Sequence, residues 1–552
     1  MVIEGEKKPV AWHYLAPEQL GMMRHHRVME PSPGCSMWNG TCVAPYPGQS
    51  WQHPKIHTSP DCLHLHGWHD MAGALTLDGV HHAFQGCPRS LGWSHSVSTD
   101  LVHWKDVDRG VHTIHETYEG MNSTQSPCSG FVSVDDSGVP CAGFRQCGST
   151  KGTTGLNPSA QPWDVPMELR CATSANMTEW GAPIMLFPLY YYRWLPYDPP
   201  RPWKDHDGKW YMAWSADGCN ATTRRLPCAA GGQLELLVAD TLRGPGSNWQ
   251  QLPPLFTTNV TKSGAATMPG VITGEFVTSG YFGGVPGDPD GGATRVVTQN
   301  RYAPTFWVGR QPAAGKPFEA YWDKVGAVGH YDYGSLTMAR TLGSDPNQVA
   351  KNGRRVLLGW IGGSLDGSQS LARDLSLSSD YELLQAFVPE LQVLRQPTTY
   401  RLTSVVSDNT AMSVPHRTGS LQLELVASFS WAGSKRPASP FGITVLGGTT
   451  SMSIDCAGTN PQAPGGCMVT VDGASGPLMP LGTTSIHVHA IVDHEIVETI
   501  VNNRTAMVTY NKNISSPSST AVTLFGTGVG GLVASLQSWK LTAANNLGPE
   551  PL

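Results

Sequence analysis

The chain has 552 residues, of which 40% are apolar and only 14% are charged, and this length allows about two to four domains of ordinary size. A net charge of −6 without a long run of Lys or Arg argues against a face for nucleic acid. A helix that spans a membrane needs about 18 consecutive apolar residues, and no uncharged apolar stretch of the sequence is that long. The 61 glycines and 43 prolines predict a folded protein of many short strands joined by turns.

The N-terminal residues 1–10 lack the apolar centre of a signal peptide, so a leader was either removed or never present. Two other features favour removal and predict a secreted or extracellular glycoprotein of a eukaryotic cell. The chain has 12 cysteines without a CxxC pair, which favours disulfides over zinc or redox motifs. It also has N-x-S/T sequons for N-glycans, which are at Asn39, Asn122, Asn176, Asn220, Asn259, Asn503 and Asn513.

The spacing of the cysteines suggests some pairs. Only Cys456 and Cys467 follow residue 230, so these two pair with each other if bridges stay within domains. In the N-terminal part the local candidates, which only geometry can confirm, are Cys35 with Cys42, Cys141 with Cys147, and Cys219 with Cys228.

Strand-like segments recur between residues 79 and 363, each bounded by Gly, Asp or Pro. Several contain Asp-Gly or Ser-Gly dipeptides that begin hairpins, as in residues 129–144 and 207–216. Such repetition is typical of the antiparallel sheets of a propeller rather than of alternating strands and helices. Residues 379–395 combine regularly spaced Leu with Pro389, and they fit strands or a connector equally well.

The composition changes near residue 396, after which strands alternate with polar turns. This pattern predicts a β-sandwich of about 150 residues. We therefore expect an all-β chain with a propeller domain over residues 1–395, including an N-terminal extension of about 60 residues, and a sandwich over residues 396–552.

Three acidic residues stand in unusual surroundings. Asp70 lies among small and apolar residues just before a predicted strand, Asp198 lies in a proline-rich stretch, and Glu275 lies in an apolar, glycine-rich segment. Glycoside hydrolysis needs two carboxyl groups beside one bond, and apolar surroundings raise a carboxyl pKa as a general acid requires. With 18 Trp and 16 Tyr, a carbohydrate substrate is a reasonable interpretation. The structural alternatives are a turn cap, a turn in a proline-rich loop and an edge-strand Glu.

A series of motifs in fixed order covers nearly the whole chain and resembles glycoside hydrolase family 32, the invertases, inulinases, levanases and plant-type fructosyltransferases. Among them are WHDMAG at 68–73, VHHAFQGCP at 80–88, YDPPRPWKDHDGKWYM at 197–212, GEFVTSGYF at 274–282 and IVDHEIVETIVNN at 491–503. The resemblance implies a five-bladed β-propeller followed by a C-terminal β-sandwich. It also implies a retaining β-fructofuranosidase that needs neither a cofactor nor a metal.

The resemblance assigns roles to the three carboxylates. Asp70 matches the Asp of the family motif WMNDPNG, which implies that it is the nucleophile. Asp198 matches the Asp of RDP, the transition-state stabiliser that binds fructose hydroxyls, and Glu275 matches the acid/base of WECPDFF. Here the Arg of RDP is replaced by Tyr197, and Arg201 is a candidate to compensate for it.

Other matches imply the residues that contact the sugar. Gln85 and Trp93 match a Gln and a Trp that line the family's sugar site, and Ser129 falls on the family's SGSA segment, where Phe131 replaces the second Ser. Asp332 belongs to a matching DYG motif and is expected to support the site. With His69 beside the nucleophile, the implied substrate-binding residues are His69, Gln85, Trp93, Ser129 and Tyr197.

Several alternatives stay open. The H-x-H pair His64 and His66 could bind a metal, although the implied chemistry needs none. The departures at His69, Tyr197 and Phe131 lie where hydrolysis could give way to fructosyl transfer. A carbohydrate-binding propeller without activity and an enzyme acting on arabinofuranose are further alternatives. The substrate is expected to be sucrose or a fructan-type oligosaccharide, and the protein a monomer or a homodimer.

Overall fold

The structure is a computed structural model of the whole chain. It describes residues 13–14, 36–38, 41–43, 54–58, 71–86, 93–107, 116–117, 124–147, 167–187, 201–217, 232–243, 248–257, 279–299, 304–342, 353–362, 367–406, 412–414, 420–433, 436–458, 466–478, 484–511, 520–526 and 532–544.

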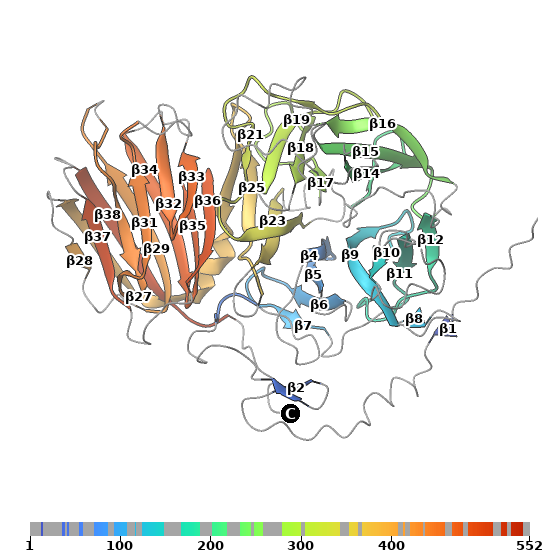
Figure 1. Cartoon of the computed structure of the whole chain (residues 1–552), viewed down its shortest axis with the longest axis horizontal. Helices are drawn as coiled ribbons and strands as arrows, with labels where there is room; N and C mark the ends of the chain where they lie inside the picture. The colour runs from blue at the N-terminus through green and yellow to red at the C-terminus, as the bar shows by residue number, and fades with distance from the viewer. Residues whose placement is uncertain are drawn as a thin grey trace, which may run out of the picture.

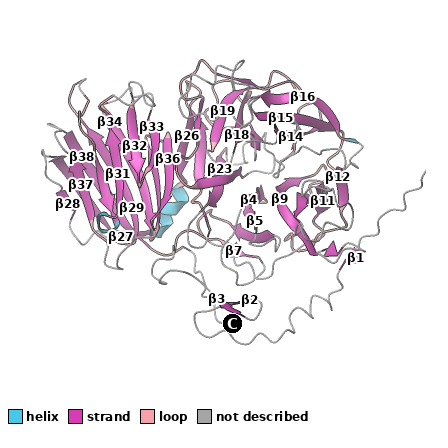
Figure 2. Ribbon diagram, viewed as in Figure 1, coloured by secondary structure: helices cyan, strands magenta, loops and turns pink. Residues whose placement is uncertain are grey.

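Strands dominate this part of the chain, and the helical turns in it are short (Figure 2). Five antiparallel sheets are arranged as the blades of a propeller, and two further sheets form a sandwich beside the last blade (Figure 1). The expected all-β fold, a five-bladed propeller followed by a C-terminal sandwich, is therefore confirmed. None of the helices among the described residues is both long and apolar enough to cross a bilayer.

The first two blades follow the chain order. Blade 1 consists of β4 (Met71–Leu77), β5 (Val80–Gly86), β6 (Trp93–Ser98) and β7 (Lys105–Asp106). Blade 2 consists of β9 (Thr124–Val134), β10 (Pro140–Cys147), β11 (Met167–Cys171) and β12 (Ile184–Phe187), and its sheet is extended by β8 (Glu116–Thr117) and β1 (His13–Tyr14). A separate hairpin joins β2 (Ser36–Trp38) to β3 (Thr41–Val43).

The next three blades repeat this pattern. Blade 3 consists of β13 (Trp203–Lys204), β14 (Trp210–Asp217), β15 (Gly232–Ala239) and β16 (Gln250–Thr257). Blade 4 consists of β17 (Ser279–Phe282), β18 (Thr294–Gln299), β19 (Thr305–Arg310) and β20 (Glu319–Ala320), with β21 (Val328–His330) also on β19. Blade 5 consists of β22 (Leu336–Thr341), β23 (Arg355–Ile361), β25 (Arg373–Leu377) and β26 (Leu383–Phe387), with β24 (Ser368–Gln369) on β23.

The sandwich begins after a short 3₁₀ helix, η6 (Pro389–Leu394), so residues 379–395 are part strand and part connector. One sheet has the order β27 (Arg395–Val406), β38 (Leu532–Leu541), β29 (Gln422–Ser430), β34 (Ser485–Asp493), β35 (Ile496–Val501) and β36 (Thr505–Tyr510). The other has the order β28 (Met412–Val414), β37 (Val522–Gly526), β30 (Phe441–Val445), β31 (Thr450–Asp455), β32 (Cys467–Val471) and β33 (Ala474–Leu478), and η8 (Leu446–Gly448) follows β30.

The hairpin that begins blade 1 shows why the turn dipeptides are informative. Asp78 and Gly79 have φ angles of 49° and 83°, which is the left-handed conformation that both central residues of a type I′ turn need. The flanking residues Leu77 and Val80 are paired across β4 and β5. The Asp-Gly dipeptide therefore forms the tight hairpin that the sequence predicts.

The structure describes one of the predicted disulfides and corrects another. Cys456 is bonded to Cys467, as expected. Cys141 is bonded to Cys171 rather than to Cys147. Cys141 and Cys171 face each other on the paired strands β10 and β11, whereas Cys147 lies six residues further along β10, about 20 Å away. The other two candidate pairs are Cys35 with Cys42 and Cys219 with Cys228. Their side chains lie outside the described residues, so both pairings stay predictions.

A buried group of charged side chains joins the propeller to the sandwich. Arg373 Nη2 donates to Asp332 Oδ2 at 3.0 Å and to Glu498 Oε2 at 2.8 Å. The other oxygen of Glu498 lies 3.1 Å from His57 Nε2, and His57 Nδ1 lies 2.8 Å from Asp493 Oδ2. All five side chains are fully buried. Each charge therefore depends on the others for compensation, because water cannot supply it.

All three carboxylates of this network also bind backbone amides from distant parts of the chain. Glu498 Oε1 accepts a hydrogen bond from the N–H of Leu371 at 2.7 Å. Asp493 accepts hydrogen bonds from the three N–H groups of residues 55–57 at 2.7–2.9 Å. Asp332 Oδ1 accepts from the N–H of Val508 in β36 at 3.1 Å. The segment that precedes blade 1 is thus bound to the sandwich, and the loop that precedes β22 is bound to the same domain.

Burial and pairing set the protonation of the network. Burial lowers the pKa of His57, but hydrogen bonds and charges from Asp493 and Glu498 outweigh burial and raise this pKa to about 9. Burial raises the pKa of Asp332 to about 6, against the opposing effect of the Arg373 charge. At neutral pH His57 is therefore protonated and bridges two carboxylates of the sandwich.

Breaking this network should destabilise the protein strongly. We expect Glu498→Gln to lower the free energy of unfolding by about 3–5 kcal/mol, because it leaves buried cationic groups with one carboxylate fewer. Denaturant titration measures this value. In the exposed pair Arg310–Glu319 the side chains are 59% and 52% exposed, so Glu319→Gln is the control and should leave the midpoint unchanged. Equal midpoints for wild type and Glu498→Gln would contradict the interpretation.

The raised pKa of His57 predicts a loss of stability in alkaline solution. The group binds its proton more tightly in the folded protein than at its ordinary pKa of 6.5, so its stabilising contribution is complete below pH 6.5 and is lost as the pH rises through about 9. Thermal unfolding midpoints between about pH 6 and pH 10 should fall more steeply for wild type than for His57→Gln. Parallel curves for the two proteins would show that His57 does not contribute in this way.

Candidate active site

A cavity lies where the first strands of the blades meet. Every blade contributes to its wall: Ala74 from β4, Val132 from β9, Phe282 from β17 and Arg340 from β22, with Arg201 from the residues just before β13. The cavity therefore lies on the propeller axis, the place where a ligand can contact all five blades at once. Figure 1 shows β4, β9 and β17 facing the centre of the ring.

The wall is largely apolar but contains two arginines. Arg201 Nη1 donates to the backbone oxygen of Ala74 at 3.3 Å. Arg340 is 8% exposed, and its Nη1 and Nη2 lie 3.3 Å and 3.5 Å from the backbone oxygens of Ala339 and Gly130. The cavity thus carries two positive charges beside β4, and Arg201, the candidate to compensate for the replaced Arg of RDP, is one of them.

The residues with the sharpest assigned roles lie outside the described part of the chain. These are the three carboxylates Asp70, Asp198 and Glu275, together with His69 and Tyr197. The roles of these five residues stay predictions.

Gln85 lies near the end of β5 and is fully buried. It is the register partner of Met71, the residue that follows Asp70. Ser94 Oγ donates to Gln85 Oε1 at 3.0 Å, and Gln85 Nε2 donates to Gln369 Oε1 at 2.7 Å. Its amide is therefore held between blades 1 and 5. The predicted contact of Gln85 with sugar would use the donor and acceptor positions of this amide that these two hydrogen bonds do not occupy. Gln369 is a member of this group that the sequence motifs did not indicate.

Trp93 begins β6 and is buried in an aromatic cluster between blades 1 and 2. Its ring lies 6.4 Å from that of Phe84 and 5.7 Å from that of Phe144, measured between centroids. A Cβ atom at Gly130 would lie 2.8 Å from the Trp93 ring, so the indole packs directly on the backbone of β9. Ser129 is the preceding residue of that strand, and its side chain lies outside the described residues.

The histidines of β5 have protein partners. His82 Nδ1 lies 2.9 Å from His95 Nε2, and burial lowers the pKa of His82 to about 4, so the ring of His82 is neutral at pH 7. His81 Nδ1 lies 2.9 Å from a threonine hydroxyl at the other side of the hairpin. The suggested metal ligands His64 and His66 lie outside the described residues.

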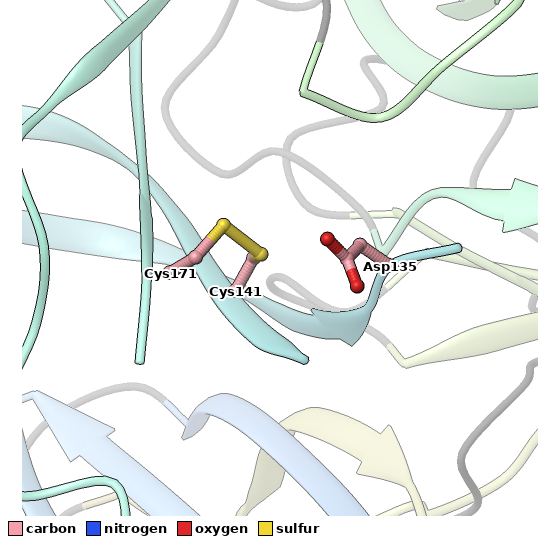
Figure 3. Close-up of side chains that lie close together, drawn as sticks. All are labelled: Asp135, Cys141 and Cys171. Atoms are coloured by element: carbon pink, nitrogen blue, oxygen red, sulfur yellow. A yellow bond between two sulfur atoms is a disulfide. The ribbon is translucent and has the colours of Figure 1, made fainter. Parts of the chain in front are cut away.

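One cluster of potential metal ligands is present among the described residues, formed by Asp135, Cys141 and Cys171. Figure 3 shows the carboxylate of Asp135 beside the two sulfur atoms, which are joined in a disulfide. Such sulfurs are not the thiolates that bind metals. Asp135 instead accepts a hydrogen bond from the N–H of Val139 at 2.8 Å and pairs with Arg243. Asp135 therefore stabilises a turn beside the disulfide.

No protein-family model and no curated protein matches the chain, but solved structures do. A fructan 1-exohydrolase IIa from Cichorium intybus is 16% identical and has a TM-score of 0.66, with 90% of this chain and 98% of that chain covered. A GH32 β-fructofuranosidase from Bombyx mori is 14% identical, with a TM-score of 0.60 over 90% and 96% of the two chains. A fructosyltransferase from A. japonicus is 15% identical, with a TM-score of 0.61 over 92% and 97%. The chain thus has the fold of glycoside hydrolase family 32 structures.

The bond between Gln85 and Gln369 can be tested by removing one amide. Gln369→Ala leaves the buried Nε2 of Gln85 without its acceptor, and we expect the free energy of unfolding to fall by about 1–3 kcal/mol. The exposed Gln251, which donates to Glu235 at 3.1 Å, is the control, and Gln251→Ala should change stability by less than about 0.5 kcal/mol. If both variants unfold at the wild-type denaturant concentration, the buried bond contributes nothing.

Proposed function

We propose that the protein is a retaining β-fructofuranosidase that hydrolyses terminal β-D-fructofuranosyl units of sucrose or a fructan-type oligosaccharide. The observation that carries this proposal is the axial cavity, to which all five blades contribute. The similarity to fructan hydrolases and β-fructofuranosidases in fold and the ordered motifs of family 32 support it.

The topology supports a common location for the three carboxylates. Each blade is built on a path of four neighbouring antiparallel strands, so the chain returns after each blade to the end of the axis at which that blade began. Asp70 directly precedes β4, Asp198 precedes β13 by five residues, and Glu275 precedes β17 by four. First strands therefore begin at one end of the propeller, and the position of the three residues in the sequence, shortly before three of these strands, supports the proposal of a shared site.

The proposed reaction is a double displacement. Asp70 attacks the anomeric carbon C2 of the fructosyl unit while Glu275 protonates the departing glycosidic oxygen, giving a covalent fructosyl-enzyme. Water then attacks C2, Glu275 accepts its proton, and Asp70 is released. Asp198 binds ring hydroxyls more tightly as positive charge develops on the sugar. Because a retaining mechanism requires this spacing, we expect the carboxyl groups of Asp70 and Glu275 to lie about 5–5.5 Å apart.

The substrate contacts follow the same proposal. His69, Gln85, Trp93, Ser129 and Tyr197 are proposed to line the fructosyl site. Of these, the described side chains of Gln85 and Trp93 are both buried and packed in blade 1, so their part is to shape the site beside β4 as well as to contact sugar.

Secretion and glycosylation belong to the same proposal. Two sequon residues are described, Asn176 and Asn503, and both are exposed in turns, where a glycan can be accommodated. The disulfides Cys141–Cys171 and Cys456–Cys467 fit an oxidising compartment. We propose a secreted protein that carries N-glycans, acts as a monomer or a homodimer, and requires no metal or cofactor.

The activity can be tested with purified protein, sucrose, inulin and levan. Released fructose is expected from at least one of them, initially as the β-anomer in NMR spectra, because two inversions retain configuration. Longer products at high sucrose would indicate fructosyl transfer instead of hydrolysis. Binding of these sugars without any product would support an inactive carbohydrate-binding propeller and contradict the proposal.

The roles of the carboxylates predict the effects of conservative substitutions. Asp70→Asn and Glu275→Gln should each lower kcat by several orders of magnitude while the protein stays folded, because each removes a reacting group. Asp78→Asn is the matched control, since Asp78 is exposed in the adjacent hairpin turn and Asn tolerates the same backbone conformation. A kcat near that of wild type in Asp70→Asn would rule out its role as the nucleophile.

A further inference from the structure

A second cavity lies where blades 4 and 5 meet the sandwich, and it shares no lining residue with the axial cavity. Figure 1 shows β21, β33 and β36 close together at this junction. Blade 4 and the residues after it contribute the stretch from Val325 to Tyr333, blade 5 contributes Glu382 and Leu383, and the sandwich contributes Pro477, Arg504 and Thr505.

The wall of this interdomain cavity combines apolar side chains with one ion pair. Arg504 Nη2 and Nε donate to the two carboxylate oxygens of Glu382 at 2.8 Å and 3.1 Å, and the arginine side chain is 31% exposed. The rings of His330 and Tyr333 lie 4.9 Å apart between centroids, and Val325 is 57% exposed. A wall of this kind suits a sugar, which has apolar C–H faces and hydroxyl edges.

The turn between β35 and β36 brings a glycosylation sequon to the same place. The sequon consists of Asn503, Arg504 and Thr505, and its last two residues line the cavity. The backbone oxygen of Asn503 accepts a hydrogen bond from the N–H of Gln385 in β26 at 2.7 Å. The turn is therefore fixed against blade 5, beside the cavity.

The neighbours of Asn503 have structural roles, whereas Asn503 itself is exposed. Asn502 Oδ1 accepts a hydrogen bond from the N–H of His487 at 2.7 Å. The hydroxyl of the buried Thr505 donates to the backbone oxygen of Pro477 at 2.7 Å. Because glycosylation requires this hydroxyl, we expect a glycan to be added before the turn folds onto the cavity wall.

We propose that the first sugars of an N-glycan on Asn503 lie over the interdomain cavity and cover its apolar rim at Val325. This inference rests on the proposed secretion and glycosylation and not on the proposed reaction. Consecutive Cα atoms are about 3.8 Å apart, so a sugar attached to Asn503 begins within reach of the wall at Arg504.

The covalent attachment makes such a contact effective. A tethered group has an effective concentration on the order of 1 mM or more near its anchor, so a contact too weak to hold a free sugar is still populated. The N-acetyl methyl group of the first sugar can pack on Val325. The exposed part of the Arg504 guanidinium can donate to sugar oxygens.

The experiment measures hydroxyl-radical labelling of the full chain secreted from a eukaryotic host. Val325 is the probe, and Val393 in η6, which is 66% exposed and outside the cavity wall, is the internal reference. If sugars cover about two thirds of the exposed surface of Val325, its labelling should rise about threefold in Asn503→Asp. Labelling of Val393 should be the same in both proteins.

Asn176→Asp provides the matched control. Asn176 is the other described sequon residue, is exposed in a turn of blade 2, and lies outside the cavity wall, so its variant should label Val325 as wild type does. Asp tolerates the positive φ of 57° at Asn503. If Asn503→Asp is not secreted, protein from a bacterial periplasm, which carries no glycan, takes its place.

The outcomes separate this inference from the proposed function. An unmodified Asn503 in mass spectra of the secreted protein would overturn the inference, and so would a glycosylated Asn503 with equal labelling of Val325 in wild type and Asn503→Asp. Protection that is confined to Val325 and lost only in the Asn503 variant would support it. A protein that releases no fructose would contradict the proposed reaction and leave the labelling result unchanged.

Discussion

The buried charges of His57, Arg373, Asp332, Asp493 and Glu498 are the interaction on which the arrangement of the two domains depends. Their contacts cross from the residues before blade 1, through blade 5, into the sandwich. Because these ions have no water to solvate them, a displacement of one domain would leave several charges uncompensated together. The apolar contacts around the network, such as those of Ile491 and Ile500 with blades 1 and 5, are less demanding in geometry. The charges therefore specify the docking that the apolar surface stabilises.

The centre of the propeller has a different character. Its walls are apolar side chains and backbone, and the described part carries positive charge from Arg201 and Arg340. The domain interface therefore pairs its buried charges with one another, whereas the described wall of the axial cavity is largely apolar and contains two arginines.

The sequence predicts the fold well because much of its information is local. The tight turn at Asp78-Gly79 follows from the backbone conformations that these two residue types adopt readily, and the alternation of strands and turns past residue 396 gives a sandwich. Pairings between distant residues are harder to predict. Cys141 bonds to Cys171 across two strands, and proximity in sequence favoured Cys147 instead. The link from Gln85 to Gln369 crosses from blade 1 to blade 5, and no local motif announces it. For the site itself, the resemblance of the motifs predicts the roles of Asp70, Asp198 and Glu275, and these roles stay predictions because the three residues lie outside the described part of the chain.

The attachment of residues 55–57 to Asp493 has a consequence for the modularity of the chain. The segment that leads toward the first blade is held by a carboxylate that is synthesised more than 400 residues later. During translation, the segment before blade 1 can therefore form these hydrogen bonds only after the C-terminal domain has been synthesised. The sandwich is for this reason a part of the propeller's assembly rather than an appended module, and exchanging it between related proteins would require the matching N-terminal segment to be exchanged with it.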